Sequence, residues 1–166
     1  MTVSKNCVDV VKHYEMFMPN PYLCPANVAT IGYGTTVYEN GKKVSLRDHA
    51  ISEADASILL HNDLERFAAD VTRLVKVPIS QNQFDSLVSF AYNLGSGALG
   101  KSTLLKYINR NVLVTNPNWK RVITMEFNKW IYAGGKKLAG LLARRQSEAW
   151  LFCDGTVKYF TEKVIK

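Results

Sequence analysis

Apolar residues recur at helical spacing along most of this chain, and the spacing predicts a mostly helical protein. The first expected helix begins after Ser4, whose side chain can cap it, and carries Val8, Val11 and Glu15 on one stripe. Pro19 ends this helix, because a proline inside a helix removes a hydrogen bond and clashes with the preceding turn. Glu15 is therefore expected close to the end of the helix.

The longest helical pattern begins at Ser52, where the sequence Ser-Glu-Ala-Asp is typical of a helix N-terminus. Pro78 stops the pattern, so we expect one long connecting helix at about residues 52–77. We expect this helix to join an N-terminal lobe of about residues 1–51 to a helical C-terminal lobe of about residues 78–166, within one domain.

The composition becomes β-branched and aromatic from Ala29 onward, which favours strands. Asn40-Gly41 is a strong signal for a two-residue hairpin turn. We therefore expect a small antiparallel hairpin or three-stranded sheet at residues 29–46. The connection before it is stiffened by three prolines, Pro19, Pro21 and Pro25.

Helical patterns alternate with short breaks in the rest of the chain. The expected helices are residues 83–94, a helix that begins at 103–109, and residues 119–131 and 138–152. Three glycines between residues 95 and 100 predict a turn, and Gly134-Gly135 separates the last two helices. Together the patterns predict an α+β fold that is mostly helical, with one small sheet near the N-terminus.

Charge is distributed unevenly along the 166 residues, whose formal net charge is +7. Residues 101–166 contain 13 Lys or Arg and 4 Asp or Glu, whereas residues 1–100 contain 8 and 10. A positive C-terminal part attracts polyanions such as nucleic acid, an anionic membrane surface or the bacterial wall with its carboxylates. The charge alone does not choose among these partners.

The three cysteines, Cys7, Cys24 and Cys153, lack the spacing of a zinc site, and their odd number argues against a complete disulfide framework. We expect no metal and reduced thiols. A Cys7–Cys24 disulfide that keeps the protein inactive until it is reduced is a lesser alternative.

The first residues lack the apolar core of a signal peptide, because Lys5, Asp9 and Lys12 interrupt it. No stretch reaches the roughly 18 consecutive apolar residues of a membrane span. We therefore expect a protein made in the cytoplasm, without stable membrane insertion and without an encoded way out.

The segment EMFMPNPYLCPANVATIGYGTT places a carboxylate, a thiol and a hydroxyl around the start of the predicted sheet, at Glu15, Cys24 and Thr30. A glutamate at a helix end can protonate the leaving oxygen of a glycosidic bond. Thr30 can hold a water, and Cys24 can act as a thiolate base or as a nucleophile. Taken singly, these residues also fit a surface glutamate, a buried cysteine and an ordinary strand threonine.

The spacing of these three residues, followed by Thr-Ile-Gly-Tyr-Gly, resembles the catalytic signature of phage lysozymes, the endolysins of one glycoside hydrolase family. Two further blocks resemble that family: QFDSLVSFAYNLG at residues 83–95 and GLLARRQSEAWLF at residues 140–152. The three blocks stand in the same order as in the family and cover roughly residues 8–155.

The resemblance implies a lysozyme-like fold with two lobes and a glycan-binding cleft between them. It also implies a muramidase that cuts the β-1,4 bond between N-acetylmuramic acid and N-acetylglucosamine in peptidoglycan, without metal or cofactor. Carried over by position, Glu15 is the acid, Cys24 stands at the place of an Asp-or-Cys residue, and Thr30 completes the triad. One arginine of the Arg144-Arg145 pair, with Arg145 preferred, would pair with Glu15.

The same resemblance implies a monomer that reaches the wall after a separate holin has permeabilised the membrane. Tyr92 and Asn93 are candidates for the cleft wall, although their place on a helix face also suits a structural role.

Two departures from the family pattern matter. Cys24 stands where many members have Asp, so the second step can use a thiolate to activate water or to attack carbon, and we favour the water route. Met16 stands where the family usually has Gly, and we expect it to crowd the cleft or loosen the lobes.

Three other classes fit parts of the sequence. A lytic transglycosylase would use Glu15 alone and leave an anhydro sugar end. A cysteine peptidase or amidase would pair Cys24 with one of three histidines, His13, His49 and His61. A nucleic-acid binder would use the basic pairs Lys120-Arg121, Lys136-Lys137 and Arg144-Arg145, but no helix-turn-helix, RNA-binding or finger signature accompanies them, so we expect no nucleic-acid partner.

Overall fold

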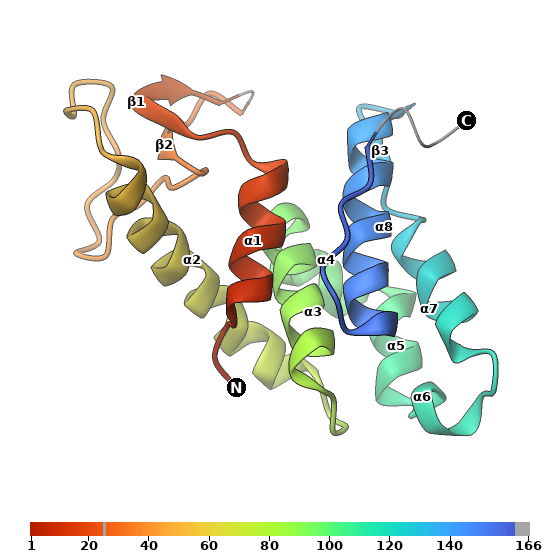
Figure 1. Cartoon of the computed structure of the whole chain (residues 1–166). Coiled ribbons are helices and arrows are strands. Elements are labelled where there is room, and N and C mark those ends of the chain that lie inside the picture. Colours follow the sequence, from red (N-terminus) through yellow and green to blue (C-terminus); the bar gives the residue numbers. More distant parts are fainter. Residues whose placement is uncertain (25, 162–166) are drawn as a thin grey trace.

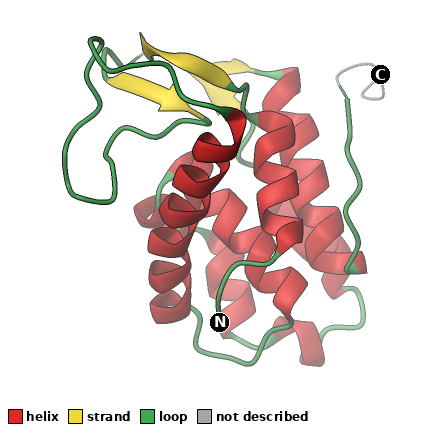
Figure 2. Ribbon diagram, turned by 60° about the vertical axis from the view of Figure 1, so that its left-hand side comes forward, coloured by secondary structure: helices red, strands yellow, loops and turns green. Residues whose placement is uncertain are grey.

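Helices dominate the computed structural model, which describes residues 1–24 and 26–161 (Figure 1). The elements are α1 (Lys5–Tyr14), β1 (Met18–Leu23), β2 (Ala29–Gly32), α2 (Glu53–Leu74), α3 (Gln81–Leu94), α4 (Ser96–Lys101), α5 (Thr103–Asn109), α6 (Val112–Thr115), α7 (Trp119–Phe127), β3 (Tyr132–Ala133), β4 (Lys136–Lys137) and α8 (Ala139–Asp154). Figure 2 shows the strands of the first hairpin gathered at one end of the helices. The expected α+β class is therefore confirmed.

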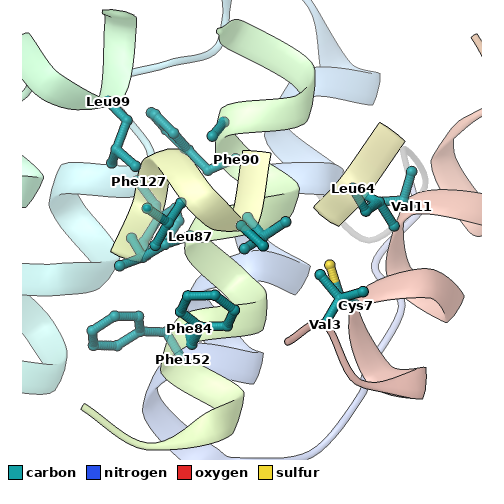
Figure 3. Close-up of a cluster of buried hydrophobic side chains, with 14 of the residues drawn as sticks. Val3, Cys7, Val11, Leu64, Phe84, Leu87, Phe90, Leu99, Phe127 and Phe152 are labelled. Carbon is teal, nitrogen blue, oxygen red and sulfur yellow. The ribbon is translucent and has the colours of Figure 1, made fainter. Parts of the chain in front are cut away.

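Helix α3 is the centre of the packing, and it contacts α1, α2, α4 and α8. Residues 84–91 of this helix are all buried, which is typical of a helix enclosed on every side. Side chains from α1, α2, α7 and α8 converge on it to form the core (Figure 3). The labelled members of this core include Cys7, Leu64, Phe84, Phe90, Phe127 and Phe152.

Helices α1 and α2 begin at the caps that the sequence predicts. The Ser4 side chain accepts a hydrogen bond from the N–H of Asn6, and the Ser52 side chain accepts one from the N–H of Asp55. Each serine therefore satisfies a backbone donor that the first turn of a helix leaves free. Helix α1 ends at Tyr14, so Glu15 is the first residue outside it and has an extended backbone.

The small sheet differs from the expected one, because its first strand is β1 rather than a strand after Ala29. Strand β1 pairs antiparallel with β2, and Tyr22 lies opposite Thr30. The prolines are tolerated because the register shifts between Met18 and Tyr22, where Pro19 and Pro21 have no N–H to donate. Pro25 lies outside the described residues. The chain turns at the predicted Asn40-Gly41 position, where an isolated bridge pairs Val37 with Lys43.

In the C-terminal half one further prediction was wrong, and one break between helices contains a hairpin that was not predicted. The glycine-rich stretch forms helix α4 instead of a turn, because this short helix buries Leu99 completely against its neighbours. Gly134 and Gly135 separate α7 from α8 as predicted, but they do so in a hairpin turn between β3 and β4, where both have positive φ angles, of 55° and 76°. Tight hairpin turns need such angles at both central residues, and glycine adopts them without strain.

No helix within residues 1–24 and 26–161 has the combination of length and apolar character that crossing a membrane requires.

Candidate active site

A pocket of about 440 Å³ lies between the β1–β2 hairpin and helices α2 and α3. It brings together all three residues of the proposed triad, Glu15, Cys24 and Thr30. Both candidates for the cleft wall, Tyr92 and Asn93, also line it. Residues from the end of α1, from the hairpin and from α3 therefore meet in one hollow, although they are far apart in the sequence.

A second hollow of about 430 Å³ adjoins the first on the side of α8. It is lined by Tyr14, Arg144 and the first turn of α8, and it shares Glu15 and Asn93 with the first pocket. The Glu15 carboxylate thus stands where the two hollows meet. An extended ligand can lie across it and occupy both sides.

Glu15 is held by a buried arginine. Its Oε1 atom lies 2.6 Å from Nη1 of Arg144, and the Glu15 side chain is 27% exposed while that of Arg144 is 4% exposed. This partner corrects our expectation that Arg145 would pair with Glu15. Neighbouring residues on a helix point about 100° apart, so only one of the two arginines faces α1.

Arg145 points toward α3 instead. Its Nε atom lies 2.7 Å from Oε2 of Glu148, its Nη2 atom donates to Oδ1 of Asn93 at 3.0 Å, and its guanidinium lies 5.2 Å from the ring centre of Phe90. Arg145 therefore contacts the pocket only indirectly, through its hydrogen bond to Asn93, and does not touch the Glu15 carboxylate.

Glu148 is fully buried and links the two arginines. Its Oε1 atom accepts from Nε of Arg144 at 3.2 Å, and Ser89 donates to the same oxygen at 2.8 Å. Two guanidinium groups and two carboxylates balance in charge, so a buried cluster of this kind avoids an uncompensated ion. Burial lowers the pKa of Arg144, but the carboxylates of Glu148 and Glu15 outweigh it and the pKa is raised overall.

Cys24 and Thr30 lie at the loop end of the β1–β2 hairpin. The N–H of Cys24 donates to the carbonyl of Val28 at 3.0 Å, which closes the loop between the strands. The pKa of the Cys24 thiol is lowered by the backbone N–H of Val28, then by that of Ala26. Thr30 is buried, and its hydroxyl donates to the carbonyl of Val28 at 3.0 Å. The hairpin thus presents a thiol that ionises more readily than usual.

The Gly-Tyr-Gly part of the sequence motif docks the hairpin onto the helices. Gly32 has a φ of +67°, and a Cβ there would lie 3.1 Å from the Cβ of Ala56 on α2. Gly34 has a φ of +112°, and a Cβ there would lie 2.8 Å from the hydroxyl of Tyr92. That hydroxyl donates to the carbonyl of Tyr33 at 2.7 Å. Both positions favour glycine because their φ angles lie in the left-handed region, and at Gly34 a side chain would also force the Tyr92 hydroxyl to move.

Tyr92 therefore has a structural task as well as a place in the pocket wall. Burial raises the pKa of its hydroxyl, which favours the protonated form that donates to Tyr33. Asn93 has its Oδ1 occupied by Arg145 and lines both hollows. Of the two, Asn93 is better placed to meet a ligand.

The sequence prediction missed a pair on α2 that also lines the pocket. Asp63 is buried, accepts a hydrogen bond from Oγ1 of Thr35 at 2.6 Å, and forms an ion pair with Arg66. Burial raises the pKa of Asp63, although Thr35 and Arg66 act against this effect. The spacing of three residues between Asp63 and Arg66 on the predicted long helix was the available signal.

Met16 does not crowd the pocket, contrary to our expectation. Its side chain is 80% exposed and is absent from the pocket wall. The chain leaves α1 at Glu15 in an extended conformation, so neighbouring side chains point in opposite directions. The carboxylate of Glu15 therefore faces the cluster while the Met16 thioether faces solvent.

The structure also weighs against two of the other classes. His13, His49 and His61 are all exposed, and none of them lines the pocket that contains Cys24. Arg144 and Arg145 are buried against carboxylates, so they cannot belong to a phosphate-facing stripe.

Cys7 is fully buried in the core, and each of the three cysteines is free. Within the described ranges, no group of three or more His, Cys, Asp or Glu side chains is arranged to hold a metal ion.

Comparison with known proteins places these features in a family. The family model described as phage lysozyme matches residues 12–148. The chain is 38% identical to the endolysin of Bacillus phage B103, over 100% of this chain and 59% of that protein. It is 36% identical to the endolysin of Bacillus phage PZA, over 95% of this chain and 57% of that protein. It therefore spans less than two thirds of the length of these two relatives.

A solved structure of a P22 lysozyme mutant is similar over the same region. The TM-score is 0.77 with 31% sequence identity, and the match covers 92% of this chain and 98% of that one. The lysozyme-like fold expected from the sequence is therefore confirmed.

Proposed function

Because this chain belongs to the phage lysozyme family, we propose that it is an endolysin that hydrolyses the β-1,4 bond between N-acetylmuramic acid and N-acetylglucosamine in peptidoglycan. The observation that carries the proposal is the meeting of Glu15, Cys24 and Thr30 in one pocket that continues past Glu15 into a second hollow. A bond placed at Glu15 then has room for sugar rings on both sides. Cleavage of the wall would lyse the bacterial host of a phage.

Glu15 acts as the general acid. Arg144 holds its Oε1 atom, which leaves Oε2 to deliver a proton to the glycosidic oxygen. The partly exposed position at the junction of the two hollows allows the carboxyl group to reach a bound glycan. As the bond to the leaving sugar breaks, the proton moves to the leaving oxygen and positive charge develops on the anomeric carbon.

Cys24 and Thr30 place the water that attacks this carbon. The thiolate form of Cys24, which the backbone N–H groups of Val28 and Ala26 favour, accepts a proton from the water. Thr30 holds the water through its hydroxyl. The water oxygen bonds to the anomeric carbon, so the muramic acid becomes a new reducing end and Cys24 becomes a neutral thiol. A direct attack by the thiolate would instead give a covalent glycosyl-enzyme.

We propose the same division into lobes that the sequence predicts. Residues 1–51 carry Cys24 and Thr30, α2 forms the core of the connecting helix at 52–77, and residues 78–166 carry Arg144. Glu15 and the two hollows around it would form the cleft between the lobes.

We propose further that the protein is a monomer that needs no metal or cofactor. It would be made in the host cytoplasm, and a holin would open its path to the wall. The attraction of its basic C-terminal half to the anionic wall would then assist binding.

Digestion of purified peptidoglycan tests this proposal. The unmodified protein and Glu15→Gln are compared, with Glu39→Gln as a matched control, because Glu39 is an exposed glutamate outside the pocket. We expect reducing muramic acid ends from the unmodified protein and from Glu39→Gln, but not from Glu15→Gln. Anhydro ends would indicate a transglycosylase that needs Glu15 alone. New amino groups would indicate an amidase or peptidase.

A further inference from the structure

The hydroxyl of Tyr14 is a junction between three parts of the chain. It lies 2.5 Å from Oγ of Ser147, 3.1 Å from the carbonyl of Ala143 and 3.0 Å from the carbonyl of Phe160. The N–H of Phe160 also donates to this hydroxyl at 3.3 Å. Tyr14 is half-buried, and burial raises its pKa, so the hydroxyl stays protonated and can donate.

The contacts of Tyr14 run beside the ion pair of the proposed acid. Tyr14 directly precedes Glu15, and Ala143 directly precedes Arg144. The Tyr14 hydroxyl lies within hydrogen-bond distance of the Ala143 carbonyl and of the Ser147 hydroxyl on the same helix, and the ion pair joins Glu15 to Arg144. The Tyr14 bond therefore fixes the end of α1 against α8 at the level where Glu15 must meet Arg144.

The segment after α8, residues 155–161, contacts this junction through the backbone of Phe160. Figure 1 shows it turning back after α8 and running alongside that helix toward the end of α1. The ring of Tyr159 stacks on His13 with centroids 3.9 Å apart. The Nζ of Lys158 lies 4.2 Å from the ring centre of Trp150, and Nε1 of Trp150 donates to Oγ1 of Thr156 at 3.1 Å. The segment is thus held along its length and closes over Tyr14.

From this arrangement we infer that Tyr14 is a positioning residue, which holds the Glu15 carboxylate against Arg144 with residues 155–161 as its clamp. The inference rests on the proposed function of Glu15. Tyr14 lines the hollow on the α8 side, but its hydroxyl is engaged by protein groups, so it acts through Glu15 and not on the sugar. A carboxyl group that drifts from its productive position loses catalytic efficiency without losing substrate binding.

The test compares Tyr14→Phe with Tyr38→Phe. Both substitutions remove one hydroxyl and keep the ring, and the Tyr38 hydroxyl donates to Asp48 at 3.0 Å, away from the pocket. With soluble glycan oligosaccharides, we expect Tyr14→Phe to lower kcat roughly tenfold with an unchanged KM. Tyr38→Phe should leave both constants unchanged. Equal losses in the two variants, or an unchanged kcat in Tyr14→Phe, would overturn the inference.

A measurement that does not depend on activity accompanies the kinetics. In the unmodified protein, Glu15 restrains the Nη1 group of Arg144, so we expect separate Nη signals for Arg144 in the NMR spectrum. These signals should average in Tyr14→Phe and persist in Tyr38→Phe. Persistence in Tyr14→Phe would overturn the inference. If the unmodified protein releases no muramic acid ends, the proposed function fails, and the Nη signals alone decide whether Tyr14 positions the ion pair.

Discussion

Gly34 passes so close to Tyr92 that a Cβ on the glycine would lie 2.8 Å from the tyrosine hydroxyl. This contact joins the loop after β2 to the centre of the molecule, because Tyr92 lies on α3. The same hydroxyl donates to the carbonyl of Tyr33, the residue that precedes Gly34 in the motif. The position of the hairpin, and of Cys24 and Thr30 with it, depends on this approach.

Gly34→Ala is therefore expected to be harmful. The added methyl group meets the Tyr92 hydroxyl, and alanine is strained at a φ of +112°. We expect a loss of about 1–3 kcal/mol in the free energy of unfolding, together with reduced peptidoglycan cleavage. Gly97→Ala is the control, because it lies in α4 with open space around it. Urea denaturation of both variants measures the difference, and equal stability would contradict the role of the close approach.

Glu148→Gln is expected to destabilise the fold strongly. The substitution leaves Arg144 and Arg145 buried with one carboxylate between them, and an uncompensated buried charge costs about 3–5 kcal/mol. The control is Asp154→Asn, which breaks the ion pair with Lys120 at the surface. Exposed pairs are worth about 0–1 kcal/mol. Thermal or urea unfolding separates the two, and a similarly small loss for Glu148→Gln would show that the cluster adapts.

Cys24 is expected to be the most reactive of the three thiols. Its pKa is lowered, so at neutral pH a larger fraction is thiolate than in an ordinary cysteine. Burial raises the pKa of Cys153 to about 11 and that of Cys7 well above its usual value. Iodoacetamide labelling followed by mass spectrometry across a pH series should show that Cys24 reacts first. As the pH is lowered, the labelling rate of Cys24 should begin to fall at a lower pH than the rate of an ordinary free thiol. Labelling in urea, where all three should react alike, is the control.

Cys24→Asp and Cys24→Ala distinguish a base from a nucleophile. An aspartate can accept the proton of the attacking water, so Cys24→Asp should keep much of the activity if the water route holds. Cys24→Ala should lower kcat by about 10²-fold or more, since general base catalysis contributes at least that much. Rates of muramic acid release give the comparison. An inactive Cys24→Asp in a folded protein would favour covalent attack by the sulfur.

Met16→Gly is expected to change little. The Met16 side chain points to solvent and lies outside the pocket, so we expect a nearly unchanged turnover. Surface substitutions of this kind change the free energy of unfolding by no more than about 0.5 kcal/mol. Met16→Ala separates the loss of the side chain from the added freedom of glycine. A large gain in turnover for both variants would mean that Met16 does obstruct the glycan.

The sequence predicted the features that depend on neighbours in the chain. The caps at Ser4 and Ser52 and the long helix that follows Ser52 could be found, because capping and helical periodicity are local. The family resemblance around Thr30 also grouped Glu15 and Cys24 with it, and all three line one pocket. These elements needed no knowledge of the tertiary arrangement.

Features set by tertiary packing were the ones that escaped prediction. Pro19 and Pro21 argued against a strand, and only the irregular pairing with β2 shows how β1 accommodates them. The choice between Arg144 and Arg145 depends on how α8 is rotated against α1, and adjacent positions in a sequence do not reveal it. The sequence shows the spacing of Asp63 and Arg66, but the burial of Asp63 and its hydrogen bond from Thr35 depend on tertiary packing.

The ion pair between Arg144 and Glu15 bridges 129 positions of the chain. During synthesis on the ribosome, α1 and the β1–β2 hairpin emerge long before α8. A nascent chain therefore carries Glu15, the proposed acid, without Arg144 and the contacts of Tyr14 until α8 has emerged. Contacts of such long range also form late in folding, because closing a long loop costs entropy first. The arrangement therefore delays the pairing of Glu15 with Arg144 until α8 has been made.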